Sequence, residues 1–299
     1  MKPSVSIIIC TLNRAHSLSQ TLETIRISAV TSTRAYEVIV VDNGSKDSTE
    51  QLCGSFSFEG KSIRYVYEKR TGKGYAYNAG ISAAQGNVLL FTDDDVRVPP
   101  HWVEEMCSPI FAGHADAVQG GVKIAPHLDR AWLKGALRVW VASVEDPLHR
   151  PPGLVGANMA ATREATVQVG GFDPRLGPGG SGFFDDTLFG WSLEKLGKRI
   201  SYRPEIAVEH HFSADRLTVK AYLKSAKRMA VSYAIAVPPA SLTTFRPSIA
   251  SLLIQLPGLF YRTATQTMRL LVSRQPDPGF VLRYYYICRW LALRKQKSH

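Results

Sequence analysis

The sequence predicts an α/β fold in which helices flank a mostly parallel central sheet, followed by a basic, mainly helical C-terminal extension. Short apolar runs rich in β-branched residues recur along the first third of the chain, and helical patterns separate them. Apolar strands that alternate with helices are typical of a parallel sheet covered on both faces. The extension is indicated by charge, because residues 216–299 contain 14 Lys and Arg but only one acidic residue.

The first elements are predicted as a regular alternation. The predicted strands are 5–10, 36–41, 63–67 and 88–91. Helical patterns separate them at 18–25, 48–52 and 74–84. Ligands of such sheets bind at the carboxyl ends of the strands. Asp42 and the acidic triplet 93–95 are both expected at that edge.

The pattern is less regular beyond Pro99. Helices are expected from residue 102, over 132–144 and over 188–196, and strands over 117–123 and 200–208. Six glycines lie between residues 170 and 182. They predict tightly turning loops around a site, because glycine adopts backbone conformations that other residues avoid.

The charge distribution suggests two parts. The net charge is +11, yet residues 1–215 contain 22 Lys and Arg against 24 acidic residues. We therefore expect a mildly acidic domain over 1–215 and a basic extension over 216–299 that meets an anionic partner.

Several features bear on the compartment. Four scattered cysteines without CxxC spacing argue against a zinc site and a disulfide framework, and they fit a reducing compartment. The strand pattern after residue 4 leaves no room for a signal peptide. Prolines interrupt the longest charge-free runs, 229–245 and 247–261, which fall short of the about 20 apolar residues of a spanning helix. These features predict a cytoplasmic protein, or one held at the cytoplasmic face of a membrane.

The acidic triplet at 93–95 predicts a metal site. Three adjacent carboxylates repel one another, and a divalent cation such as Mg²⁺ or Mn²⁺ relieves the repulsion. Along an extended segment Asp93 and Asp95 share one side, so they can hold one metal together, whereas Asp94 points away. A solvated acidic turn is the alternative, and the position after an apolar strand favours the metal.

A second acidic pair, Asp185 and Asp186, follows the glycine-rich loops. A helix N-terminus stabilised by acidic side chains would explain it. A general base is the functional interpretation, because a hydroxyl nucleophile must lose its proton as it attacks. His210 and His211 follow the last predicted strand and are either structural residues or metal ligands.

In their order, these segments resemble glycosyltransferase family 2, the inverting transferases with a GT-A fold. The resemblance covers about residues 4–211. The segments that carry it are 6–14, 40–49, 74–86 with 91–95, 156–160 with 170–173, and 185–187. Two positions depart from the family pattern: Leu12 stands where many members carry a Tyr that stacks on the nucleotide base, and Asp185 replaces the commoner Glu.

The resemblance implies a GT-A catalytic domain over 1–215 with three sets of site residues. The donor-binding set is Thr11, Asn13, Arg14, Asp42, Asn78 and Asp94, and Lys73 joins it as a cation that could neutralise phosphate charge. The acceptor-binding set is Asn158, Gly180 and Asp185. The metal ligands are Asp93 and Asp95 with His210 or His211, and Asp186 is the general base.

The implied reaction is a direct displacement that moves a sugar from a nucleotide-sugar, expected to be a UDP-sugar, to a hydroxyl of a glycan or lipid-linked acceptor. A divalent metal, Mn²⁺ or Mg²⁺, stabilises the leaving diphosphate. Asp42 would orient the nucleotide base, and Asp94 the ribose or the sugar.

The extension has two interpretations. Basic residues among aromatic and aliphatic ones are typical of a helix that binds an anionic membrane surface. Helices that pack on the catalytic domain with a solvated basic face explain the same pattern. Nucleic acid is not expected as a partner, because no nucleic-acid-binding motif accompanies the charge.

Two other functions would explain the same residues. A nucleotidyltransferase acting on sugar phosphates also combines a parallel sheet with acidic metal ligands. A membrane-associated scaffold could use the same fold without catalysis, although it would have no need of both acidic clusters. A dinucleotide-binding oxidoreductase is disfavoured, because no G-x-G-x-x-G follows the first strand.

Overall fold

A computed structural model describes residues 4–30, 32–58, 61–145, 153–237 and 275–296. Residues 238–274 of the predicted extension, with the apolar run 247–261, lie outside the described residues.

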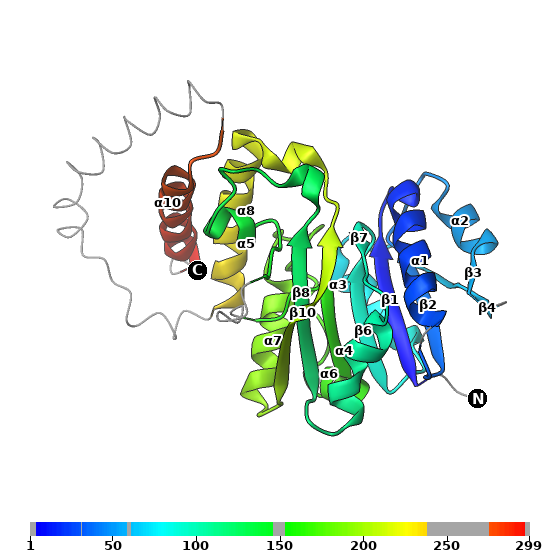
Figure 1. Ribbon diagram of the computed structural model, residues 1–299. Helices are drawn as coiled ribbons and strands as arrows, with labels where there is room; N and C mark the ends of the chain where they lie inside the picture. The colour runs from blue at the N-terminus through cyan, green and yellow to red at the C-terminus, as the bar shows by residue number, and fades with distance from the viewer. Residues whose placement is uncertain (1–3, 31, 59–60, 146–152, 238–274, 297–299) are drawn as a thin grey trace, which may run out of the picture. The chain divides into compact units, whose positions relative to one another are not determined.

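A mixed α/β architecture is built around one large sheet (Figure 1). Its strand order is β5-β2-β1-β6-β9-β8-β10-β7. The strands are β1 (Val5–Thr11), β2 (Tyr36–Asp42), β5 (Arg64–Tyr67), β6 (Val88–Asp93), β7 (Val96–Arg97), β8 (Ala117–Ile124), β9 (Asn158–Thr162) and β10 (Ile200–His210). The pairs β5–β2, β2–β1, β1–β6 and β8–β10 are parallel, whereas β9 runs antiparallel to both neighbours and β7 antiparallel to β10. Strands β3 (Ser57–Phe58) and β4 (Lys61–Ser62) form a separate small hairpin.

Helices follow most of the strands. They are α1 (Ala15–Val30), α2 (Thr49–Ser55), α3 (Lys73–Ala83), α4 (Trp102–Phe111), α5 (Ala136–Val139), α6 (Arg163–Gln168), α7 (Asp185–Lys195), α8 (Val219–Ala236) and α10 (Pro278–Gln296), with 3-10 turns at Pro126–Leu128 and Ala214–Leu217. The predicted fold class, a mostly parallel sheet flanked by helices, is therefore confirmed.

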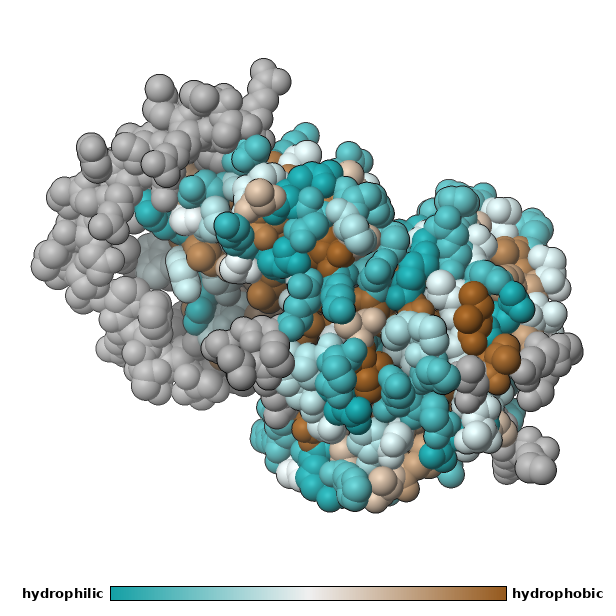
Figure 2. Space-filling view, in the orientation of Figure 1, coloured by the Kyte–Doolittle hydropathy of each residue, from teal (hydrophilic) through white to brown (hydrophobic). Residues whose placement is uncertain are grey.

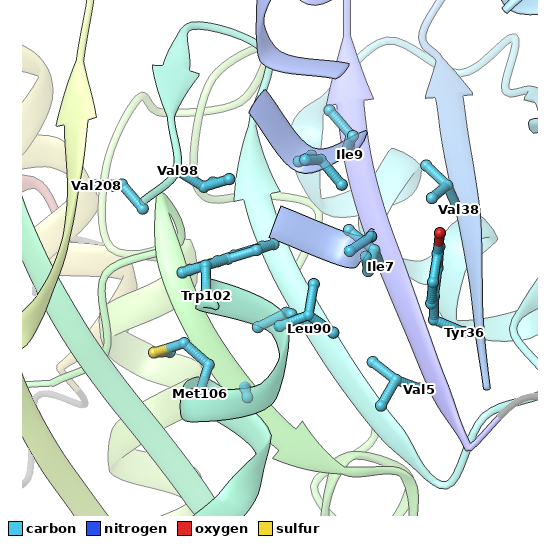
Figure 3. Packing of buried hydrophobic residues seen from close by; sticks show 14 of the residues in the cluster. Val5, Ile7, Ile9, Tyr36, Val38, Leu90, Val98, Trp102, Met106 and Val208 are labelled. Carbon is cyan, nitrogen blue, oxygen red and sulfur yellow. The ribbon is translucent and has the colours of Figure 1, made fainter. Parts of the chain in front are cut away.

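Both faces of the sheet are buried, as the apolar character of its strands requires. Ile7 and Ile9 of β1 point to one side, where Trp102 of α4 lies against the same cluster (Figure 3). Ile8 points to the other side and joins a cluster that includes Tyr77 of α3. Each buried aliphatic side chain of this kind contributes about 1.5–3 kcal/mol to folding. This burial holds the carboxyl ends of β1, β2 and β6 in a fixed position.

The chain divides into two compact units. One comprises residues 1–128, 142–180 and 185–212 and contains the large sheet; the other comprises 129–141, 181–184 and 213–299 and contains α5, α8 and α10. Within the second unit α8 packs against α10, and the Tyr222 ring of α8 contacts the rings of Trp132 and Trp140. The predicted domain boundary at residue 215 stays a prediction.

Two segments differ from the sequence-based expectation. The helix predicted over 132–144 is wrong: only α5 is helical there, because Gly135 and Ala142 both adopt positive φ angles (53° and 64°) that end an α-helix. Strand β9 was not anticipated, because its sequence Asn-Met-Ala-Ala-Thr lacks the large β-branched residues typical of strands. Its small side chains lie in the middle of the sheet, between β6 and β8.

The surface is mixed in character. On the face shown in Figure 2 hydrophilic residues predominate, and hydrophobic ones lie between them. Among the described residues, no helix combines the length and the apolar composition needed to cross a bilayer. The predicted cytoplasmic location stays a prediction.

Candidate active site

Strand register brings the predicted site residues to one edge of the sheet. Thr11 at the end of β1 is paired with Asp42 at the end of β2, and Cys10 is paired with Asp93 at the end of β6. Residues far apart in the sequence therefore meet at the carboxyl edge, where ligands of such sheets bind. All of the residues described below belong to the unit that contains the large sheet.

Two carboxylates and one imidazole form a possible metal site. Asp93, Asp95 and His210 each present one ligand atom, and these atoms lie within 4.8 Å of one another. The imidazole Nε2 of His210 is 3.3 Å from Asp95 Oδ1. Neighbouring ligands of an octahedral Mg²⁺ or Mn²⁺ lie about 3 Å apart, close to this distance, and the two carboxylates are ligands that such cations prefer.

The antiparallel pairing of β10 with β7 delivers the histidine. His210 is paired with Val96, which follows the acidic triplet directly. His211 turns away: its backbone N–H donates to the carbonyl oxygen of Asp95 at 2.7 Å, and its ring contacts Glu209 at 3.3 Å. Of the two candidate histidines, His210 is the one in the cluster.

Asp94 is buried on the opposite side of the triplet. Its carboxylate accepts hydrogen bonds from the Thr11 hydroxyl at 2.7 Å and from Arg14 at 3.0 Å. Burial raises the pKa of Asp94 to about 6, and the nearby Arg14 guanidinium opposes this rise. Arg14 also contacts Asp95 at 2.8 Å, so one guanidinium is shared by two of the three aspartates.

Lys73 supplies the second cation. It is the first residue of α3, and its ammonium forms an ion pair with Asp93. Burial opposes its charge, but Asp93, Tyr77 and Asp185 raise the pKa of Lys73 well above its usual value. The lysine therefore stays charged between the metal-directed carboxylates and the acidic pair at the start of α7.

The acidic pair occupies two different environments. Asp186 accepts hydrogen bonds from the backbone N–H groups of Gly156 at 2.8 Å and Thr187 at 2.7 Å. Asp185 is 6% exposed and packs on Gly177, where an added Cβ would lie 2.5 Å from its carboxyl carbon. Burial raises the pKa of both carboxyl groups, and the charge of Asp186 raises that of Asp185 further.

The expected base-binding residues connect two loops. Asp42 accepts hydrogen bonds from the Ser45 backbone N–H at 2.7 Å and the Tyr65 hydroxyl at 2.8 Å. Asn13 adopts a positive φ of 54°, and its side-chain oxygen accepts a hydrogen bond from the Lys46 backbone at 2.7 Å. These contacts hold the loops after β1 and β2 together at the carboxyl edge.

Three predicted site residues make contacts of a structural kind. The amide of Asn78 both donates to and accepts from the backbone of Phe172, at 2.8 and 2.9 Å. Asn158 has no exposed surface, and its amide contacts Trp102, Gly121 and Ile206. Gly180 is exposed, and an added Cβ would lie 2.6 Å from the Arg175 carbonyl oxygen.

Sequence reasoning missed two contributors. The Thr21 hydroxyl donates to the carbonyl oxygens of Asp94 and Val96, at 3.0 and 2.8 Å, and so fixes the backbone of the acidic turn. No motif marks a threonine inside a helix. The sequence indicates Gly156 only as part of the segment 156–160, because residue type does not show which backbone N–H groups donate to a site.

Comparison with known proteins places these residues in a family context. The family model described as "Glycosyl transferase family 2" matches residues 6–164. Glycosyltransferase AglE of Haloferax volcanii is 33% identical over 122 residues, which cover 40% of this chain and 40% of that protein. The chain thus spans less than half of the length of this curated relative. The glucosyl-dolichyl phosphate glucuronosyltransferase of the same organism is 21% identical over 221 residues, 69% of this chain and 68% of its own.

Solved structures share the fold. The mannosyltransferase PcManGT from Pyrobaculum calidifontis, solved with GDP-Man and Mn²⁺, has a TM-score of 0.67 at 20% identity and covers 99% of this chain and 88% of its own. Glucosyl-3-phosphoglycerate synthase from Mycobacterium tuberculosis, solved with Mn²⁺, UDP and its product, has a TM-score of 0.52 at 21% identity, covering 76% of this chain and 78% of its own.

Proposed function

The chain belongs to glycosyl transferase family 2 and is a glycosyltransferase, and we propose that it moves a sugar with inversion from a nucleotide-sugar to a hydroxyl of a glycan or lipid-linked acceptor. One observation carries the proposal: the possible metal ligands Asp93, Asp95 and His210 lie together at the carboxyl edge of the sheet. Lys73, which pairs with Asp93, also interacts electrostatically with Asp185 and Asp186. The possible metal site, which would bind the leaving group, thus lies next to an acidic pair that could accept a proton from the nucleophile.

The donor half of the proposed site uses the residues at the ends of β1, β2 and β6. Asp93, Asp95 and His210 would hold a divalent cation, Mn²⁺ or Mg²⁺, which neutralises charge on the leaving diphosphate. Asp42, with Thr11, Asn13 and Arg14 on the adjoining loop, would position the nucleotide, and Lys73 would meet the diphosphate. Mannosyl and glucosyl relatives of this fold were solved with GDP-Man and with UDP, so both nucleotides are candidates beside the expected UDP-sugar.

The acceptor half uses the acidic pair. Asp186 takes the proton of the acceptor hydroxyl as its oxygen attacks the anomeric carbon, and the bond to the diphosphate oxygen breaks on the opposite face. The backbone donors Gly156 and Thr187 orient the carboxylate of Asp186 for this role. Asp185 would line the acceptor side. Asn78 and Asn158 have no direct part in the proposal, because their amides are engaged with protein groups.

The test separates chemistry from binding. We expect Asp186→Asn to lower sugar transfer by at least about 100-fold, the lower end of the effect of a general base, while donor affinity changes little. Asp116→Asn, a carboxylate before β8 that pairs with Arg199, is the matched control and keeps full activity. Release of a nucleoside diphosphate with each transfer supports the proposal. Turnover of Asp186→Asn near the wild-type rate would refute the assignment of the base.

We further propose that the unit containing α8 and α10 binds an anionic membrane surface. Lys220, Lys224 and Lys227 are exposed at helical spacing along one face of α8. Tyr286, Ile287 and Leu291 of α10 are about half exposed, at 52%, 52% and 49%. Each lysine near an anionic surface contributes about 1 kcal/mol, and exposed apolar side chains insert at the interface.

Vesicle co-sedimentation tests the membrane proposal. Replacing the three α8 lysines by Gln should reduce binding to vesicles containing anionic lipid more than tenfold, on the scale of about 1 kcal/mol per charge. Replacing Arg26, Lys123 and Lys195 by Gln removes the same charge from the other unit and should leave binding unchanged. Equal losses in the two triple variants would show that only net charge matters and would contradict a dedicated surface.

A further inference from the structure

The two metal-directed carboxylates each carry an internal cation. Asp93 is paired with Lys73, and Asp95 lies 2.8 Å from a guanidinium nitrogen of Arg14. The cations come from different elements, since Lys73 opens α3 and Arg14 lies in the loop between β1 and α1. Each of these two carboxylates is therefore paired with a positive charge before any metal binds, and a divalent cation must compete with groups of the protein itself.

Arg14 can keep its position when a metal binds. It contacts Asp95 through Oδ2, whereas Oδ1 of the same carboxylate faces His210 at 3.3 Å. Arg14 also contacts the buried carboxylate of Asp94 at 3.0 Å, and Asp94 is not among the possible metal ligands. This second contact anchors the guanidinium, and it leaves one oxygen of Asp95 directed at the metal site.

Lys73 is placed differently. Its ammonium contacts Oδ1 of Asp93, and both side chains are about one-fifth exposed, at 18% and 21%. An ammonium and a divalent cation on the same carboxylate repel each other strongly at such short range. Binding of the metal therefore favours a Lys73 conformation in which the ammonium has left Asp93.

The surroundings limit where the ammonium can go. The backbone of Lys73 is held by the Pro178 carbonyl at 2.8 Å, so only the side chain is free to swing. Gly72 and Gly179 approach so closely that an added Cβ on Gly179 would lie 2.5 Å from the Gly72 Cα. Because the backbone of Lys73 is fixed at the N-terminus of α3, its flexible side chain can reach only a limited region beside the metal cluster. The diphosphate of the donor would occupy this region.

We propose that Lys73 couples metal binding to donor binding by exchanging partners: it neutralises Asp93 in the free protein and the donor's diphosphate in the loaded protein. The inference rests on the proposed function, because it requires that a metal and a nucleoside diphosphate share the site. It adds a thermodynamic consequence. The metal displaces Lys73 from Asp93 and so makes the ammonium available to the diphosphate, and the diphosphate draws Lys73 away and so makes Asp93 available to the metal. By linkage, the metal must strengthen nucleotide binding by the same factor by which the nucleotide strengthens metal binding.

The proposal predicts effects of opposite sign. In Lys73→Met, Asp93 loses its internal competitor, so Mn²⁺ alone should bind more tightly than to the wild type. The same variant should bind UDP or GDP more weakly, because the diphosphate loses its cation. If Lys73 only stabilised the fold, its removal would weaken the binding of both Mn²⁺ and the nucleotide.

Titration calorimetry and Mn²⁺ electron paramagnetic resonance measure the coupling. We expect UDP or GDP to raise the Mn²⁺ affinity of the wild type at least about tenfold, within the usual range of allosteric coupling. In Lys73→Met the factor should be smaller by about threefold or more, and the part that remains comes from direct attraction between the metal and the diphosphate. Lys73→Arg keeps the charge and should keep most of the coupling. Lys69→Met, an exposed lysine four residues earlier, is the matched control and should behave as the wild type.

A second variant keeps the test valid if Lys73→Met does not fold. Asp93→Asn frees Lys73 from its partner, so it should bind UDP or GDP more tightly than the wild type in EDTA, where no metal contributes. Equal coupling in Lys73→Met and wild type, or weaker nucleotide binding of Asp93→Asn in EDTA, would overturn the exchange. Failure of the wild type to bind either nucleotide with Mn²⁺ would instead refute the proposed function. Independent binding of metal and nucleotide would refute the coupling alone.

Discussion

Asp185 and Asp186 are adjacent in the sequence, but their carboxylates have different partners. Asp186 is held by two backbone N–H groups, which favour its ionised form and fix its direction. Asp185 lies buried against Gly177, where burial disfavours its charge. Burial raises the pKa of both groups; the backbone donors oppose this rise at Asp186, whereas the charge of Asp186 adds to it at Asp185.

The buried carboxyl group of Asp185 makes the stability of the protein depend on pH. Burial and the charge of Asp186 raise the pKa of Asp185 from 3.8 to about 7. A carboxyl group whose pKa is raised by folding stabilises the folded protein at pH values below its pKa in the unfolded chain. This contribution is lost as the pH rises through the pKa of the group in the folded protein. We expect Asp185→Asn, which stays neutral, to be more stable than the wild type by an amount that grows from about pH 4 to pH 7 and levels off above it, reaching about 2–4 kcal/mol.

Thermal unfolding of both proteins in EDTA, from pH 4 to pH 9, measures this difference. Chelation keeps metal binding out of the comparison. A constant gap between the two melting temperatures over the whole range would contradict a raised pKa for Asp185.

At the scale of elements, one buried asparagine joins four parts of the sheet layer. Asn158 begins β9 and donates to Gly121 of β8 and Ile206 of β10, both at 2.8 Å. It also accepts a hydrogen bond from the Trp102 indole of α4 at 2.8 Å. Gly120 is needed beside it, because an added Cβ there would lie 2.2 Å from the amide nitrogen of Asn158.

We expect Asn158→Ala to lower the free energy of unfolding by about 3 kcal/mol or more. Each buried polar group left without a partner costs about 1–3 kcal/mol, and this change removes the hydrogen-bond partner of two carbonyl oxygens and an indole N–H. Gln168→Ala, at an exposed position of α6, should change stability by less than about 0.5 kcal/mol. Urea unfolding measures both. A loss of activity in Asn158→Ala without loss of stability would point instead to the acceptor-binding role that the sequence suggested.

The elements that sequence reasoning predicted well are those with a strong local signal. Strands β1, β2 and β6 are apolar runs, and the ends of β2 and β6 place Asp42 and Asp93 at the carboxyl edge of the sheet. Strand β9 lacks that signal, and the long helix expected over 132–144 is interrupted by positive φ angles that residue type does not reveal at Ala142. The choice between His210 and His211 depended on the pairing of β10 with β7, a contact between distant segments.

At the scale of the whole chain, charge is divided between segments with different roles. The acidic groups of the site need cations, and Lys73 and Arg14 provide two within the protein. The excess of basic residues lies in 216–299 instead. Changes in salt should therefore affect the proposed membrane binding more strongly than the close ion pairs of the site, whose partners are in direct contact.

Chelation tests whether this protein needs a metal for sugar transfer. We expect EDTA to lower sugar transfer by about 100-fold or more, the scale at which charge stabilisation of a transition state is lost. Mn²⁺ or Mg²⁺ added in excess should restore it. Asp95→Asn should require a higher metal concentration for the same recovery, and full activity of the wild type in EDTA would exclude a metal-dependent mechanism.

The position of β10 has a consequence for truncation of the chain. Strand β10 pairs with β8 inside the large sheet, and its last residue, His210, belongs to the possible metal cluster. A chain cut after residue 164, where the family match ends, would leave the edge of β8 unpaired and would lack that histidine. The matched segment is therefore expected to aggregate when it is produced alone.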